Sequence, residues 1–200
     1  MKTKKRAVAL CARLALCAAI AAALSNASAA PTTASFEPSA EVGGTTLQLN
    51  GKGTRYRFAF KVYDMALYTT KKVSSAEDLL RLQGPKSLHF VALRELPGTE
   101  LGRLFLRGMS DNATSLQMTR HAQASNRLIE VFSGRPKMLA GESFAMEFEP
   151  GKGTTFYILG KAQGAPVGDA EFFGLVLRIW FGDSPADHLL KDALLDRPRE

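Results

Sequence analysis

Apolar and polar residues alternate along several stretches of the chain, and this period of two is typical of half-buried β-strands. The first stretch begins with Thr45, Leu47 and Leu49, and we expect its strand to end at Asn50-Gly51. The longest covers residues 55–69 and is dense in aromatic and β-branched side chains. If this stretch is one strand, its side chains alternate between two faces. One face has Tyr56, Phe58, Phe60 and Val62, and the other has Arg55, Arg57, Lys61 and Tyr63. Further strands are predicted at residues 87–93, 143–149 and 154–159.

Capping signals and a longer apolar period predict helices between these strands. The box Ser75-Ala76-Glu77-Asp78 opens a short helix that ends near Gln83. A longer helix follows with Thr99 as its cap, and another is expected at about residues 122–132. Asp169 caps an apolar helix over about 170–181. The run Ser184-Pro185-Ala186-Asp187 caps the last helix, with proline at its first position.

The tetrapeptide Gly-Lys-Gly-Thr occurs twice, at residues 51–54 and 151–154, each time at the end of a predicted strand. We interpret both copies as hairpin turns, because glycine tolerates the backbone angles that tight turns require. Neither copy has the spacing of a phosphate-binding P-loop. Since hairpins join antiparallel strands, the pattern predicts an α+β domain, a mainly antiparallel sheet covered by helices.

Composition changes this picture once the first residues are considered separately. The whole chain has 26 bases and 19 acids, a net charge of +7, but residues 1–29 contain five of the bases and no acid. The remaining 200 − 29 = 171 residues therefore carry 21 − 19 = +2, which argues against a nucleic-acid-binding protein. A basic start, an apolar run and Ala27-Ser28-Ala29 together are typical of a secretory signal peptide cleaved after Ala29.

The predicted organisation is a signal peptide over 1–29, a flexible leader over 30–40, one domain over 41–196 and a tail over 197–200. We expect a periplasmic or secreted monomer without a stable membrane span after cleavage. Both cysteines lie inside the predicted signal, and the three histidines are far apart in the sequence. We therefore expect no metal site and no cofactor.

Two polar residues interrupt otherwise apolar surroundings and are candidate ligand contacts. Asn112 occupies the next position of the apolar stripe on the helix after Thr99, one turn beyond Gly108. An inward amide must face a cavity or find hydrogen bonds, and the periodicity leaves open whether Asn112 does the first or caps the helix end. Arg55 stands beside the aromatic run, where a guanidinium could hold a carboxylate or enolate by two hydrogen bonds.

The order of these motifs resembles the chalcone isomerase-like family. The resemblance rests on residues 49–55, 60–68, 105–112, 150–154 and 177–191, and covers about 41–196. It implies an open-faced β-sandwich, in which a large antiparallel sheet lies under a layer of helices with a ligand cleft between them. Family enzymes close a chalcone to a flavanone, whereas other members bind fatty acids without catalysis.

The resemblance also implies roles for individual residues. Arg55 and Asn112 match the arginine and asparagine of the enzymes and are the candidate catalytic residues. Tyr63 replaces an enzyme threonine and is similar to a tyrosine of the fatty-acid binders. Phe105 and Ile179 stand where the enzymes have hydroxyl side chains, so the network that would orient an oxyanion is largely replaced by apolar groups.

Three functions follow as expectations. The first is an exported, non-catalytic protein that binds a fatty acid or similar amphipathic carboxylate through Arg55, Tyr63, Phe105, Asn112 and Ile179. The second is an intramolecular lyase or isomerase acting on a chalcone-like enone, and the third is a structural envelope protein with a closed core. Along a straight strand Arg55 and Tyr63 would be roughly 26 Å apart, so the sequence leaves open whether they meet.

Overall fold

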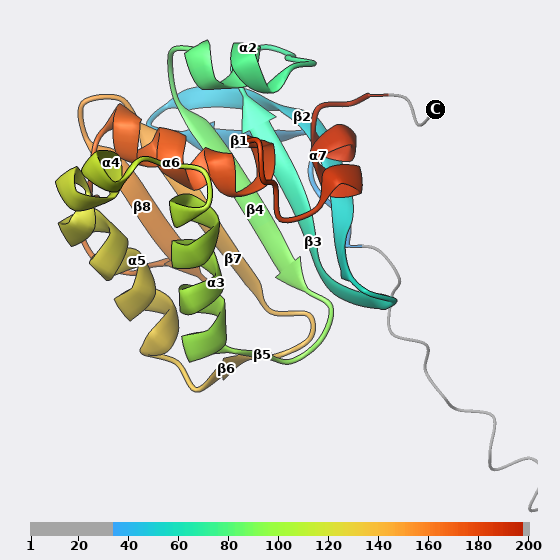
Figure 1. Ribbon diagram of the computed structural model, residues 1–200. Coiled ribbons are helices and arrows are strands. Elements are labelled where there is room, and N and C mark those ends of the chain that lie inside the picture. Colours follow the sequence, from blue (N-terminus) through green and yellow to red (C-terminus); the bar gives the residue numbers. More distant parts are fainter. Residues whose placement is uncertain (1–33, 198–200) are drawn as a thin grey trace, which may run out of the picture. The chain divides into compact units, whose positions relative to one another are not determined.

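The structure is a computed structural model and describes residues 34–197 (Figure 1). Its main sheet has the strand order β1-β2-β3-β4-β7-β8-β9, and every neighbouring pair is antiparallel. The strands are β1 (Ser39–Val42), β2 (Thr45–Arg57), β3 (Phe60–Thr69), β4 (Lys86–Ala92), β7 (Ser143–Glu149), β8 (Gly153–Ile158) and β9 (Lys161–Ala162). A small second sheet pairs β5 (Leu96–Pro97) with β6 (Lys137–Met138).

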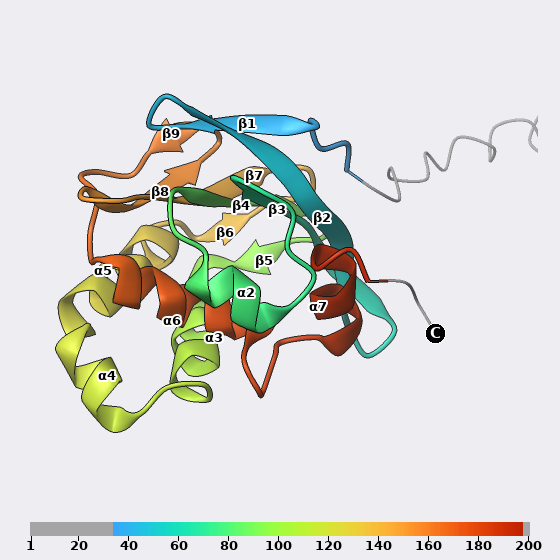
Figure 2. The ribbon, with the colours of Figure 1, turned by 90° about the horizontal axis from the view of Figure 1, so that it is seen from above.

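Helices cover one face of the main sheet, as Figure 2 shows from above. They are α2 (Ala76–Arg81), α3 (Gly98–Ser110), α4 (Ser115–Arg120), α5 (Ala122–Ser133), α6 (Ala170–Phe181) and α7 (His188–Leu194). None of these described helices is long and apolar enough to cross a bilayer. The predicted α+β class, with an antiparallel sheet covered by helices, is confirmed.

The main core lies between this sheet face and the helices α3, α5 and α6, and aromatic rings fill it. The rings of Phe90 and Phe144 stack with centroids 4.4 Å apart, and Phe105 meets Trp180 edge-on at 5.8 Å. Offset and edge-on arrangements satisfy the ring quadrupoles, so these contacts add to the hydrophobic stabilisation of the core.

A smaller cluster lies on the opposite face, where β1 folds back over β4 and β7. Its buried members are Val42, Leu47, Ala66 and Tyr68. Residues 34–38 also pack here: the Tyr68 hydroxyl donates to the Glu37 carbonyl at 2.9 Å, and the ring of Phe36 covers the cluster. The beginning of the described chain is thereby tied to the sheet.

The two Gly-Lys-Gly-Thr segments have different structures, and the hairpin prediction for the first was wrong. Residues 51–54 lie inside the continuous strand β2, which passes close under α7. A Cβ atom on Gly51 would come within 2.4 Å of the Ala193 carbonyl oxygen, so this glycine permits close packing rather than a turn. The second copy does turn, with Gly151 and Gly153 at φ +79° and +110°.

The run 55–69 is also not the single strand that its alternation predicts. A two-residue turn at Phe58 and Ala59 divides it, so its first residues end β2 and the others form β3. Aromatic residues continue through the turn without the glycine or asparagine that usually marks one, and the pattern therefore hid it. As a result, Arg55 and Tyr63 are register partners across the hairpin.

Helix positions agree closely with the pattern, and the corrections concern their first turns. Helix α3 begins at Gly98, so Thr99 is not its cap, and the N-cap Pro97 offers no side-chain bond. Helix α7 is capped by Asp187, which leaves Pro185 outside the helix. Helix α4 was not predicted, although its capping box is visible in the sequence as Thr114 and Gln117.

Asn50 is a buried polar link between three parts of the chain. Its side chain donates to the carbonyls of Val73 at 3.0 Å and Leu194 at 2.8 Å, and accepts from the Val73 amide at 2.7 Å.

We expect Asn50→Leu to lower the free energy of unfolding by about 3 kcal/mol, because it leaves these backbone groups buried without partners. Urea unfolding of this variant and of Asn126→Leu, an exposed control, measures the difference; equal losses would contradict the role of Asn50.

Lys86 is a second buried polar group, at the start of β4. Its ammonium donates to the carbonyls of Leu82 at 2.5 Å and Gly84 at 3.2 Å, and burial lowers its pKa to about 8. Between this value and the ordinary 10.5 the unfolded chain binds more protons at Lys86, so stability rises with pH.

Comparing wild type with Lys86→Met isolates this contribution. Between about pH 7 and about pH 10, the unfolding free energy of the wild type should rise by about 2 kcal/mol relative to that of Lys86→Met. Urea unfolding at both pH values checks it, and a difference independent of pH would contradict it.

Candidate functional site

Arg55 and Tyr63 face each other where β2 and β3 approach the hairpin turn. The guanidinium carbon of Arg55 lies 5.5 Å from the centroid of the Tyr63 ring. Arg55 is half-buried, while Tyr63 is only 1% exposed. A cation over an aromatic ring is stabilised by the ring quadrupole, and this contact fixes the direction of the arginine.

Tyr63 in turn is held by helix α6. The indole Nε1 of Trp180 donates to the Tyr63 hydroxyl at 2.7 Å, in a fully buried contact. Burial raises the pKa of Tyr63, and the nearby Arg55 and the Trp180 hydrogen bond only partly oppose that effect. The hydroxyl therefore remains protonated around neutral pH and can serve as a hydrogen-bond partner rather than as a base.

A cleft opens beside Arg55, between the β2–β3 hairpin, the β4–β5 connection and the first half of α3. Its lining consists of Arg55, Arg57, Val62, Arg94, Glu95, Leu96, Pro97, Glu100, Leu101 and Leu104. Its floor is formed by the buried Val62, Leu96 and Leu101 with half-buried Leu104, and its rim by half-buried Arg55 and the exposed charged residues. Its volume is about 100 Å³. Pockets for drug-sized ligands usually have roughly 300–1,000 Å³, so this cleft fits a head group and a few carbon atoms.

The charges at the cleft are unequally satisfied. Arg57 forms an ion pair with Glu100 at 3.3 Å, and Lys137 pairs with Glu95 at 2.7 Å. Arg55 forms no ion pair with any described carboxylate, and its Nε is buried without a hydrogen-bond partner. A buried guanidinium nitrogen without an acceptor is costly, and an incoming carboxylate could supply that acceptor.

Phe105 and Ile179 lie deeper than the cleft, inside the closed core. They are 2% and 3% exposed, and neither lines the cleft. Ile179 explains the glycine in α3, because a Cβ atom on Gly108 would come within 2.9 Å of the Ile179 Cγ2. The close approach at Gly108 is thus between the helices α3 and α6.

Asn112 lies apart from Arg55, at the end of α3. Its amide donates to the carbonyls of Gly108 and Ser184, both at 2.9 Å, and accepts from the Ser184 amide at 2.8 Å. The periodicity left open whether the Asn112 amide faces a cavity or bonds backbone at the helix end, and these contacts are of the second kind. They tie α3 to the loop between α6 and α7.

Several residues around Arg55 were not anticipated from the sequence. Arg57 and Arg94 join the rim, and Trp180 supports Tyr63 from behind. The alternation placed Arg57 on the face of Arg55, and both line the cleft, whereas Arg94 and Trp180 lie in segments distant in sequence that gave no local signal. Within the described residues, no group of histidine, cysteine or carboxylate side chains could hold a metal ion.

Taken together, these features define a class of protein: an antiparallel sheet under a helical layer, with an arginine at the mouth of a cleft between them. The chain belongs to the chalcone isomerase-like family, whose model matches residues 29–196. This confirms the resemblance found in the sequence.

Among solved structures, the chain is similar to the crystal structure of a fatty-acid binding protein of Arabidopsis thaliana. The TM-score is 0.61 at 14% sequence identity, and the match covers 80% of this chain and 91% of the other. At this identity the likeness concerns the fold. No curated protein matches the sequence.

The Tyr63 to Trp180 contact yields a prediction for the support of the site. Tyr63→Phe should lower the free energy of unfolding by about 1–3 kcal/mol, because it leaves the buried indole N–H without an acceptor. Tyr56→Phe is the control, since this ring is 42% exposed. Urea unfolding followed by the emission of Trp180, the single tryptophan, measures both variants. Equal stability of Tyr63→Phe and wild type would contradict the assigned contact.

Proposed function

We propose that this protein binds an amphipathic carboxylate, of the fatty-acid class, with Arg55 as the anchor of the carboxylate. The observation that carries the proposal is the half-buried guanidinium, with an unpartnered Nε, beside an apolar cleft floor. A carboxylate matches a guanidinium in charge and in planar geometry. The similar Arabidopsis structure is that of a fatty-acid binding protein, which supports this ligand class.

The alkyl part of the ligand would lie on the floor formed by Val62, Leu96, Leu101 and Leu104. The cleft of about 100 Å³ holds only the first carbons of a long chain. A longer chain needs α3 to separate from the sheet at its first turn. That end of the helix lacks a side-chain cap, but the Gly98 amide donates to the Pro136 carbonyl at 3.1 Å, so separation would have to break this bond.

The role that we propose is binding without catalysis. No residue lining the cleft has a hydroxyl group, and Tyr63, whose hydroxyl accepts a hydrogen bond from Trp180, lies behind Arg55 and not in the cleft lining. Stabilisation of an oxyanion requires several donors aimed at the developing charge, and the donors that line the cleft are three arginines, of which Arg57 is paired with Glu100 and Arg94 lies over the Phe60 ring. The isomerase alternative rests on Arg55, since Asn112 is engaged with Ser184 at the far end of α3.

We further propose that the protein works outside the cytoplasm after cleavage behind Ala29. The support is the basic, apolar and small-residue sequence of residues 1–29, which lie outside the described part of the chain. Intact mass of protein recovered from the periplasm tests this proposal.

The binding experiment uses Trp180 as an internal reporter, because its indole contacts Tyr63 directly behind Arg55. Titration with laurate should give a saturable change in emission. Arg55→Gln should weaken laurate binding at least about tenfold, the effect of losing one charge-assisted pair. Arg103→Gln, an exposed arginine of α3 outside the cleft, is the matched control and should bind like wild type.

Two outcomes would overturn the binding proposal. Methyl laurate, which has no carboxylate, would bind as tightly as laurate, or Arg55→Gln would bind laurate like wild type. Chalcone cyclisation is measured in parallel and should stay at the spontaneous rate. A faster rate that falls in Arg55→Gln would favour the isomerase instead.

A further inference from the structure

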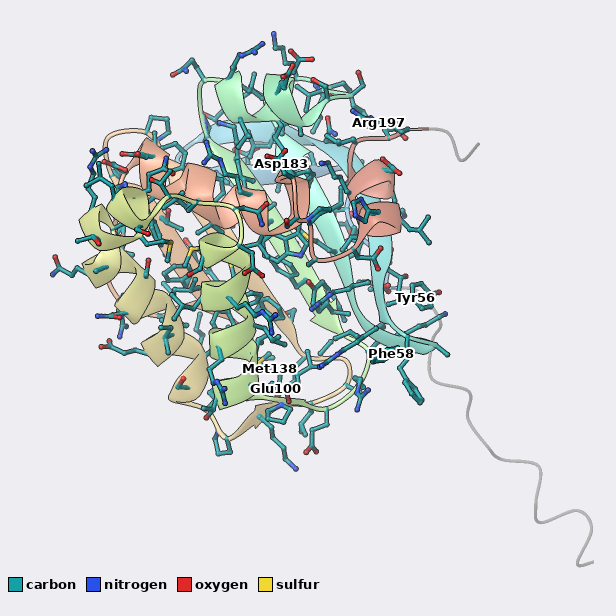
Figure 3. All side chains as sticks on the ribbon, viewed as in Figure 1. Tyr56, Phe58, Glu100, Met138, Asp183 and Arg197 are labelled. Carbon is teal, nitrogen blue, oxygen red and sulfur yellow. The ribbon has the colours of Figure 1, made fainter. Side chains whose placement is uncertain are left out.

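The end of the β2–β3 hairpin exposes aromatic side chains that the proposed cleft does not use. We call residues 56–60 the hairpin tip; Figure 3 shows Tyr56 and Phe58 there, at the end of the hairpin. Phe58 is 91% exposed, Phe60 64% and Tyr56 42%. Large apolar side chains gathered at one projecting point, rather than scattered singly, usually mark an interaction surface.

The hairpin tip has a strained backbone at Phe58, the residue whose side chain is most exposed. Phe58 has φ +55°, in the left-handed region that glycine, asparagine and aspartate favour. A bulky residue there costs stability, and its ring makes no compensating packing contact at 91% exposure. The backbone strain at Phe58 is not offset by packing of its ring in the folded protein, and this points to a role of the ring in binding.

Basic side chains surround the aromatic ones. Arg55 and Arg57 precede the turn, Lys61 follows it, and the Arg94 guanidinium lies 5.8 Å from the centroid of the Phe60 ring. The acids nearby are Glu100, paired with Arg57, Glu95, paired with Lys137, and Asp187, which accepts from the Tyr56 amide at 2.9 Å. Bases therefore outnumber acids around the tip, which makes this end of the molecule complementary to an anionic surface.

We propose that the hairpin tip docks onto the surface of a bilayer containing anionic lipids, with the ring of Phe58 entering the interface first. Aromatic side chains partition into the boundary between head groups and hydrocarbon, and nearby arginines and lysines bind anionic head groups. A narrow hairpin end can insert side chains between lipids without any change in the fold.

The size of the tip favours a lipid surface over a protein partner. Stable protein interfaces bury about 800 Å² on each side, whereas an aromatic side chain contributes about 150–250 Å². The three rings thus fall short of a stable protein interface. Insertion of single side chains into lipid needs no matching surface, and it gains from the bases behind them.

Docking at the tip would also place the cleft next to the membrane. Arg55 and Arg57 belong both to the cleft rim and to the basic surround of the tip. An amphipathic acid could then pass between the bilayer and the cleft without crossing open water. This consequence rests on the proposed function of the cleft, while the docking rests on the tip alone.

Flotation with vesicles of phosphatidylcholine and phosphatidylglycerol tests the docking. Wild type should bind these vesicles and release at high salt, because the basic contribution is screened. Phe58→Asn should weaken vesicle binding at least about tenfold, since burial of one large apolar side chain contributes that much. The matched control is Leu116→Ala, which removes a side chain that is 67% exposed on α4 and should bind like wild type.

Two further readouts separate docking from ligand binding and from misfolding. Phe58→Asn should keep laurate affinity in vesicle-free solution and should melt at a higher temperature, because asparagine relieves the strain at φ +55°. Arg55→Gln should lose laurate binding but keep most vesicle binding. Wild type that does not float with the vesicles overturns the proposal, as does self-association that Phe58→Asn abolishes without any vesicle binding.

Discussion

The hydrogen bond from Trp180 to the Tyr63 hydroxyl joins the helical layer to the sheet at the centre of the core. Rings from both layers pack around it, and burial keeps the hydroxyl protonated because it raises the pKa of Tyr63. The same tyrosine presents its ring to Arg55, so the position of the arginine depends on the packing of α6. A change in the core is therefore transmitted to the mouth of the cleft.

The β2–β3 hairpin has an inner part that fixes the fold and an outer end that carries the features we propose for binding. At its inner part the hairpin is fixed by Asn50 and by the close approach of α7 at Gly51. At its outer end it carries an unpartnered Arg55 Nε and the strained, exposed Phe58. The two features that reduce folding stability, the unpartnered Nε and the strained φ, thus lie at the outer end, away from the contacts that fix the inner part of the hairpin. This distribution is what a binding surface on a rigid scaffold requires.

Much of the fold could be predicted because local periodicity and caps dictate it. Asp169 and the apolar run after it specify α6, and the alternation at residues 143–149 specifies β7. The candidate site was less accessible. Arg55 attracts attention as a base beside an aromatic run, but Arg94 and Trp180 reach it only through tertiary contacts between distant segments. No local pattern encodes such contacts.

The sequence by itself determined the α+β class, the main helices and the residue types available for binding. The tertiary structure decided what two ambiguous segments do. Gly-Lys-Gly-Thr is a turn after β7, but its first copy is part of the continuous strand β2. There α7 packs so closely that only glycine leaves room for it. The aromatic run folds into a hairpin despite its strand-like alternation, since pairing within the sheet outweighs the strain at Phe58. That pairing brings Arg55 to Tyr63.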